Sequence, residues 1–199
     1  MRVKKVVVLL ILLFVISACN SKTEKKSDNN SSGVTEKSVI ADNKKISKEK
    51  SKEITFTLET IDGTTIHIKE IENGLEFQEF KGRPIYLILF GYRCPPCLKE
   101  IPELIELTKE HQDLKIIAME VQGLDSDALQ EFVTDRGINY PVISGYNYMD
   151  FISYIQLKAQ WGGAIPLLLG LNKKGEVEIM QIGGVSKREL EMGYKELIN

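Results

Sequence analysis

The strongest constraint on the fold is an apolar strand that runs almost directly into a helix. Residues 84–90 read Pro-Ile-Tyr-Leu-Ile-Leu-Phe, a continuous apolar run typical of a strand that is covered on both faces. Residues 96–110 then place apolar side chains at helical spacing, and residues 114–121 form a second apolar run. A strand, a helix and a strand in this order predict a parallel strand pair joined by a helical crossover, which is the unit of α/β folds.

The remaining C-terminal sequence extends this unit into one domain, residues 54–199. Residues 54–58 and 65–68 alternate apolar and polar side chains around Asp62-Gly63, which predicts a β-hairpin. We therefore expect an α/β domain with a central mixed β-sheet flanked by helices and an N-terminal β-hairpin extension. Further helices are expected over 125–136, over 148–158 and after a capping box at 186–189, and further strands over 167–171 and 177–182. Four methionines are expected to fill gaps in the core: Met119, Met149, Met180 and Met192.

Residues 1–18 are typical of an export signal. A basic start precedes an apolar run, residues 6–16, that is too short to span a bilayer. The run ends in Ile16-Ser17-Ala18-Cys19, which resembles the lipobox of bacterial lipoproteins. That resemblance implies acylation of Cys19 and an extracytoplasmic, lipid-anchored protein on a bacterial membrane, on the periplasmic side in a Gram-negative cell. The alternative is an ordinary signal peptide cut after Ala18, which would leave Cys19 as a free thiol.

Residues 19–53 are predicted to be the lipidated N-terminus and a disordered tether. They are rich in Ser, Asn, Lys, Asp and Glu and have no aromatic residue, so they offer too little apolar surface to offset the entropy of ordering. The charge is uneven: residues 20–53 carry nine Lys against six acidic residues, whereas residues 54–199 carry 14 Lys and Arg against 22 Asp and Glu. An acidic domain argues against nucleic acid as a partner, because phosphate binding needs a basic face.

The predicted helix begins at a pair of cysteines, in the segment Cys94-Pro95-Pro96-Cys97, shortly after the predicted strand ends. Free N–H groups and the dipole at a helix N-terminus favour negative charge, so this position stabilises the thiolate of Cys94. A thiolate is the nucleophile of disulfide exchange, and Cys97 is close enough in sequence to resolve a mixed disulfide. The spacing therefore predicts a redox-active dithiol that needs no cofactor.

The cysteine pair has three other interpretations. A structural staple is disfavoured because so short a loop constrains the unfolded chain least. A zinc or iron–sulfur site needs further ligands, and the sequence offers only Cys19, His67 and His111. A copper chaperone that pairs two cysteines with a downstream histidine has no such residue here. We expect no metal site.

The active-site segment is also recognisable. Residues 90–102, Phe-Gly-Tyr-Arg-Cys-Pro-Pro-Cys-Leu-Lys-Glu-Ile-Pro, resemble those of thioredoxin-like proteins, specifically the membrane-anchored TlpA/ResA-like thiol-disulfide oxidoreductases near the AhpC/TSA and redoxin branch. The resemblance covers about residues 54–199. It implies catalytic roles for Cys94, Cys97 and Glu100, a proline (Pro102) within the active-site helix, and a cis Ile165-Pro166 bond lying against the cysteines.

Each implied residue also has its own physical interpretation. A carboxylate at Glu100 would raise the pKa of the thiols and relay a proton, although a solvated helix Glu is the alternative. Arg93 stands where most relatives have Trp, and its charge would favour the Cys94 thiolate and acidic substrates. Trp161 is expected near Ile165 and Pro166, either lining a substrate groove or packing in the core. Substrate binding is thus expected at Arg93, Trp161, Ile165 and Pro166.

The direction of electron flow follows from the residues between the cysteines. Pro95 and Pro96 lack N–H groups that would stabilise the Cys94 thiolate, which favours a reducing couple. The resemblance implies disulfide-containing exported proteins as substrates, with apocytochrome c as the best-known type, and a membrane thiol-reducing protein as electron donor. Two alternatives remain open: an oxidase or isomerase of exported proteins, and a non-catalytic metal-handling or binding module.

Overall fold

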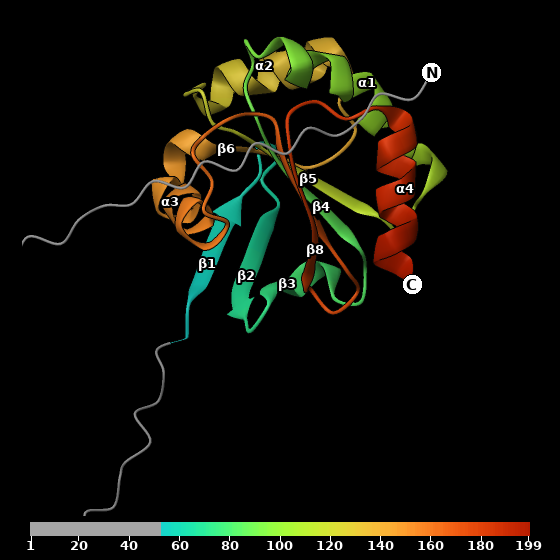
Figure 1. The fold of residues 1–199 in the computed structure, drawn as a ribbon. Coiled ribbons are helices and arrows are strands. Elements are labelled where there is room, and N and C mark those ends of the chain that lie inside the picture. Colours follow the sequence, from blue (N-terminus) through green and yellow to red (C-terminus); the bar gives the residue numbers. More distant parts are fainter. Residues whose placement is uncertain (1–52) are drawn as a thin grey trace, which may run out of the picture. The chain divides into compact units, whose positions relative to one another are not determined.

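The computed structural model describes residues 53–199. The predicted signal peptide, Cys19 and nearly all of the predicted tether lie outside the described residues. The described part contains two sheets and four α-helices (Figure 1). No helix within this part is long and apolar enough to cross a membrane.

The central sheet has five strands in the order β6-β5-β4-β7-β8. β4 lies in the middle, parallel to β5 and antiparallel to β7, so the sheet is mixed as predicted. Every residue of β4 is buried, because helices or a second sheet cover both of its faces. The bounds are β4 Ile85–Phe90, β5 Lys115–Glu120, β6 Val142–Ser144, β7 Leu167–Leu171 and β8 Val177–Ile182.

A separate antiparallel sheet precedes the central one. The predicted hairpin is confirmed as β1 (Thr55–Glu59) paired with β2 (Thr65–Ile71). The sequence prediction missed a third strand, β3 (Gly74–Phe77), which pairs with β2 and buries Leu75 and Phe77. Four residues are too few to show a clear alternation, so only the pairing with β2 reveals this strand.

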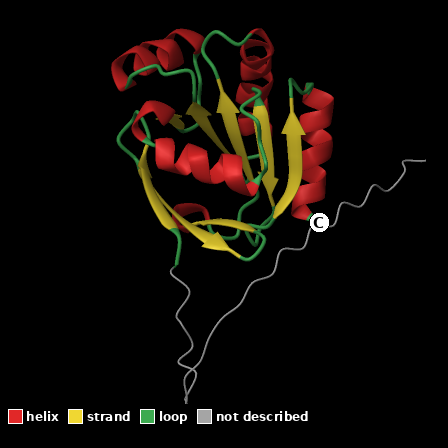
Figure 2. Ribbon diagram, turned by 60° about the vertical axis from the view of Figure 1, so that its left-hand side comes forward, coloured by secondary structure: helices red, strands yellow, loops and turns green. Residues whose placement is uncertain are grey.

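The two faces of the central sheet carry different layers (Figures 1 and 2). Because side chains alternate along a strand, Leu87 and Leu89 of β4 face the three-stranded sheet and α3, whereas Tyr86 and Ile88 face α1, α2 and α4. The helices are α1 Pro95–Glu110, α2 Ser126–Arg136, α3 Met149–Lys158 and α4 Lys187–Ile198.

Local capping signals place the helix ends where the sequence predicts them. Asp125 accepts from the Ala128 N–H at the start of α2, which ends at Gly137 in the left-handed conformation. Ser186 and Glu189 form the predicted capping box of α4.

The prediction for the methionines is wrong for three of the four. Met119 is fully buried, but Met149, Met180 and Met192 are 60%, 43% and 58% exposed. They lie at the N-terminus of α3, on the edge strand β8 and on α4, where no other layer of residues 53–199 covers them.

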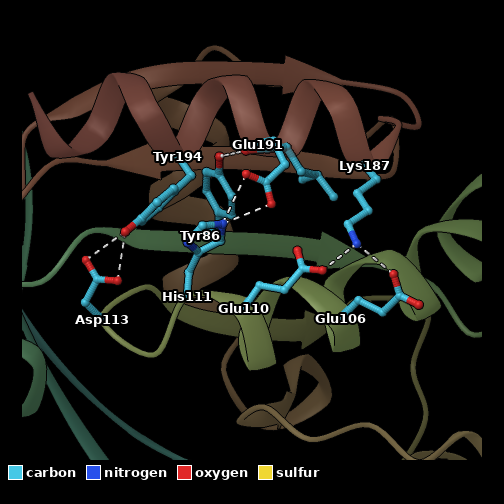
Figure 3. A network of polar contacts seen from close by, with 9 residues as sticks. Tyr86, Glu106, Glu110, His111, Asp113, Lys187, Glu191 and Tyr194 are labelled. Carbon is cyan, nitrogen blue, oxygen red and sulfur yellow. Dashed lines mark hydrogen bonds and ion pairs between the residues drawn. The ribbon is translucent and has the colours of Figure 1, made fainter.

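Polar contacts fasten α4 along α1 (Figure 3). Lys187 forms ion pairs of 2.8 Å with both Glu106 and Glu110. Beyond them, the ring of His111 lies 2.9 Å from Glu191. Farther along α4, the Tyr194 hydroxyl donates to Asp113, which follows α1, at 2.8 Å. These contacts join the C-terminal end of α1 and the residues just after it to one side of α4.

We expect Gly193→Ala to destabilise the domain, although alanine is normally favoured over glycine inside a helix by about 1 kcal/mol. A Cβ at Gly193 would lie 2.5 Å from the Tyr86 hydroxyl and 3.0 Å from Cδ1 of Ile179. Tyr86 is buried, and its hydroxyl donates to the Leu190 carbonyl, so it cannot move aside freely. Denaturant unfolding should show a loss of about 1–3 kcal/mol, and a smaller loss in a Tyr86→Phe background; equal losses in both backgrounds would contradict this explanation.

Candidate active site

The two cysteines lie at the start of α1, shortly after the end of β4. After β4 ends at Phe90, residues 91–94 form a turn closed by the Cys94 N–H donating to the Gly91 carbonyl at 3.1 Å. Cys94 is the N-cap of α1, and Cys97 lies in the first helical turn. The two side chains form a disulfide, with Cα atoms 5.2 Å apart. The structure therefore unites the pair that the sequence singled out and holds it as the oxidised half of a dithiol couple.

Among the described residues, few hydrogen-bond donors lie near the Cys94 sulfur. Its Sγ lies 3.3 Å from the backbone N–H of Cys97 and 3.7 Å from the Ile165 carbonyl oxygen. Pro95 and Pro96 occupy the first two helical positions and have no N–H. The first backbone N–H that the helix can offer to a Cys94 thiolate is consequently that of Cys97.

Glu100 is a buried carboxyl on the next turn of α1, with only 4% of its surface exposed. The interpretation of this residue as a solvated helix Glu is therefore wrong. Oε1 accepts the Val185 N–H at 2.5 Å, which favours the ionised form. Burial outweighs that bond and raises the pKa of Glu100 to about 7. A carboxyl with this pKa can both give and take a proton near neutral pH.

The loop before β7 lies against the cysteines. The Ile165-Pro166 peptide bond is cis, and its Ile165 carbonyl faces the sulfur of Cys94. Trp161 is 4% exposed and belongs to the core, and its indole N–H donates to the Ala164 carbonyl at 2.6 Å. The indole therefore shapes this loop from inside, which matches the core-packing interpretation of Trp161.

Arg93 is exposed beside Cys94. Its guanidinium lies 4.7 Å from the centre of the Tyr92 ring, a cation–π contact that leaves the charge open to solvent. Cys19, the predicted lipidation site, lies outside the described residues.

Sequence reasoning missed two residues that support the turn from β5. Glu120, fully buried at the end of β5, accepts the backbone N–H groups of residues 122–124 and of Tyr92 in the turn after β4. Gln122 accepts the N–H of Arg93 at 2.9 Å. An acidic residue that ends an otherwise apolar strand was the only signal for Glu120, and nothing in the local pattern marked Gln122.

The fold and the paired cysteines at a helix N-terminus, next to a cis-proline loop, define a thioredoxin-like thiol-disulfide oxidoreductase. Comparison with known families agrees: the AhpC/TSA family model matches residues 50–180. The chain belongs to this family and is an enzyme of dithiol–disulfide exchange whose partners carry disulfides.

Similar curated sequences include several that are named thiol-disulfide oxidoreductase ResA. That of Halalkalibacterium halodurans is 24% identical over 169 residues, covering 83% of this chain and 86% of the relative. One from Bacillus cereus is 30% identical over 156 residues, covering 76% and 82%.

Solved structures share the fold. StoA from Bacillus subtilis has a TM-score of 0.54 and 22% identity, covering 70% of this chain and 96% of that structure. A thiol:disulfide interchange protein of the thioredoxin family from Chlorobium tepidum has a TM-score of 0.60 and 20% identity, covering 73% and 94%.

Proposed function

We propose that the protein is a membrane-anchored extracytoplasmic reductant of protein disulfides. The Cys94 thiolate attacks one sulfur of a substrate disulfide, and the other substrate sulfur leaves and takes a proton. The Cys97 thiolate then attacks Cys94, which releases the second substrate thiol and forms the Cys94–Cys97 disulfide. Two electrons have passed to the substrate, and a thiol-reducing donor restores the dithiol.

The observation that carries this direction is the shortage of donors around Cys94. With Pro95 and Pro96 in the first turn, Cys97 supplies the nearest helical N–H, at 3.3 Å. Weak stabilisation of the thiolate makes the reduced form less stable and the couple more reducing. Arg93 opposes this tendency with a positive charge next to Cys94, but it is exposed and its field is screened by solvent.

We assign Glu100 to proton transfer. It is buried on the same helix as the cysteines and its pKa, raised to about 7, is suited to protonating a leaving thiolate and accepting the proton of Cys97. The substrate chain would lie along the Ile165-Pro166 loop, with the Ile165 carbonyl beside the reacting sulfur. Arg93 would meet acidic substrate side chains, and Trp161 would hold the loop from beneath through Ala164.

The location is proposed from the sequence. The signal-like residues 1–18 and the lipobox-like ending at Cys19 support export and acylation, and residues 20–53 would separate the domain from the membrane. Such a position suits apocytochrome c and other exported proteins as substrates, and a thiol-reducing membrane protein as donor. An oxidase or isomerase of exported proteins is the competing direction.

A redox equilibrium decides the direction. The purified protein is equilibrated in thiol/disulfide buffers of defined ratio, dithiothreitol for the reducing range and glutathione for the oxidising range, and the oxidised fraction is measured by trapping free thiols. We expect a potential near that of reducing thioredoxins, about −270 mV, and far from that of strongly oxidising enzymes, about −120 mV. A value near the oxidising limit would replace the reductase with an oxidase.

A further inference from the structure

The turn that presents Cys94 is held by a side chain from a different strand end. Gln122 follows β5, which lies parallel to β4, and reaches across to the turn between β4 and α1. Its Oε1 accepts the Arg93 N–H at 2.9 Å, directly before Cys94. We propose that Gln122 is a positioning residue for Cys94, setting where the nucleophilic sulfur lies relative to the Cys97 N–H.

Gln122 passes so close over the turn that the residue beneath it has no room for a side chain. A Cβ at Gly91 would overlap Cγ, Cδ and Oε1 of Gln122, and these are the three nearest atoms it would meet. Gly91 does not have a positive φ, so its backbone conformation suits other residues. The nearest obstacle to a side chain at Gly91 is therefore Gln122.

Glu120, at the end of β5, holds the backbone of Gln122 in place. One of its carboxylate oxygens accepts the N–H groups of Gln122 at 2.9 Å and of Tyr92 at 3.4 Å. The other accepts those of Gly123 at 3.0 Å and Leu124 at 2.9 Å. The carboxylate thus fixes the backbone of Gln122 and touches the turn itself, so the amide of Gln122 projects from a rigid support.

The support from Gln122 matters because, within residues 53–199, few other contacts direct the Cys94 sulfur. The turn is closed by the 3.1 Å bond from the Cys94 N–H to Gly91, and the Cys97 N–H lies 3.3 Å from the sulfur. If the Arg93 N–H loses its acceptor, the backbone before Cys94 gains freedom and the sulfur spends less time at that N–H. A thiolate with less hydrogen bonding has a higher pKa, and exchange near neutral pH is slower.

This inference rests on the proposed role of Cys94 as nucleophile, and the test separates the two. The reduced full chain is alkylated with iodoacetamide over a range of pH, with mass spectrometry assigning the label to Cys94. If wild-type Cys94 is not alkylated even at about pH 9, above the ordinary pKa of a cysteine thiol, the proposed function fails. If the wild type reacts but the variants below match it, only the positioning role fails.

Gln122→Met keeps the length of the side chain and removes the acceptor at an exposed position. We expect the pKa of Cys94 to rise by roughly half a unit or more, and the alkylation rate at pH 7 to fall about threefold. The charged groups around the turn, Arg93, Glu100 on α1 and Glu120 on β5, are unchanged in this variant. Gln122→Glu retains an acceptor and should behave like wild type in about 0.5 M salt, which screens its charge.

Gly91→Ala is a second, independent test of the contact between Gln122 and the turn. It should reproduce the rise in Cys94 pKa by pushing Gln122 aside, but should add less than about a twofold change in rate to a Gln122→Ala variant, because the overlapping atoms are then gone. Thermal unfolding of each variant checks that the fold is intact. Independent, additive effects of the two changes, or a Gln122→Met protein with wild-type pKa and rate, would overturn the proposal.

Discussion

Cys94→Ser is expected to abolish disulfide exchange. Serine at the N-cap still accepts the helix N–H, so α1 should form normally, but a hydroxyl is not a nucleophile towards sulfur at neutral pH. The rate of reduction of insulin disulfides should fall by about a thousandfold or more, to the uncatalysed background. Circular dichroism and thermal unfolding of the reduced wild type provide the matched reference for folding.

Cys97→Ser should behave differently, because it removes the resolving thiol and leaves the attacking one. Cys94 is then expected to remain linked to its substrate as a mixed disulfide that reductant releases and that non-reducing gels detect. The double variant Cys94→Ser, Cys97→Ser is the control and should trap nothing. Adducts on Cys97 in the Cys94→Ser protein, with none on Cys94 in the Cys97→Ser protein, would reverse the assigned roles.

Glu100→Gln is expected to change the pH dependence of catalysis. With a pKa raised to about 7, the Glu100 carboxyl should contribute an ionisation near neutral pH to kcat/KM for a disulfide substrate. Glutamine cannot exchange that proton, so the ionisation should vanish and kcat/KM at pH 7 should fall by about tenfold or more. Glu103→Gln, on the same helix, should leave the profile in place. An unchanged profile in Glu100→Gln would remove Glu100 from proton transfer.

The same substitution has a predictable effect on stability. Because burial raises the pKa of Glu100 from 4.5 to about 7, the folded protein binds the proton more tightly than the unfolded chain. The stability that the protonated Glu100 carboxyl contributes is fully present below pH 4.5 and is lost as the pH rises through about 7. Glu100→Gln should therefore match wild type near pH 4 and be more stable by about 1–3 kcal/mol near pH 8, as measured by urea unfolding. A glutamine amide oxygen can still accept the Val185 N–H.

The parts of this protein that sequence patterns determine are those built by neighbours along the chain. The apolar run of β4, the helical spacing of α1 and the caps of α2 and α4 involve contacts within a few residues, and all were predicted with nearly the observed bounds. The cysteine pair belongs to this group, since its chemistry depends on two residues separated by one helical turn.

Tertiary structure alone decided which side chains are buried and what they meet. Glu100 and Trp161 are buried because Val185 and the core close over them, and Met180 is exposed because it lies on an edge strand. β3 exists because β2 offers it a partner. Glu120 and Gln122 reach the cysteine turn because β5 lies parallel to β4, which brings residues about thirty positions apart to the same end of the sheet. Such contacts depend on packing between distant segments, and short-range periodicity carries no information about it.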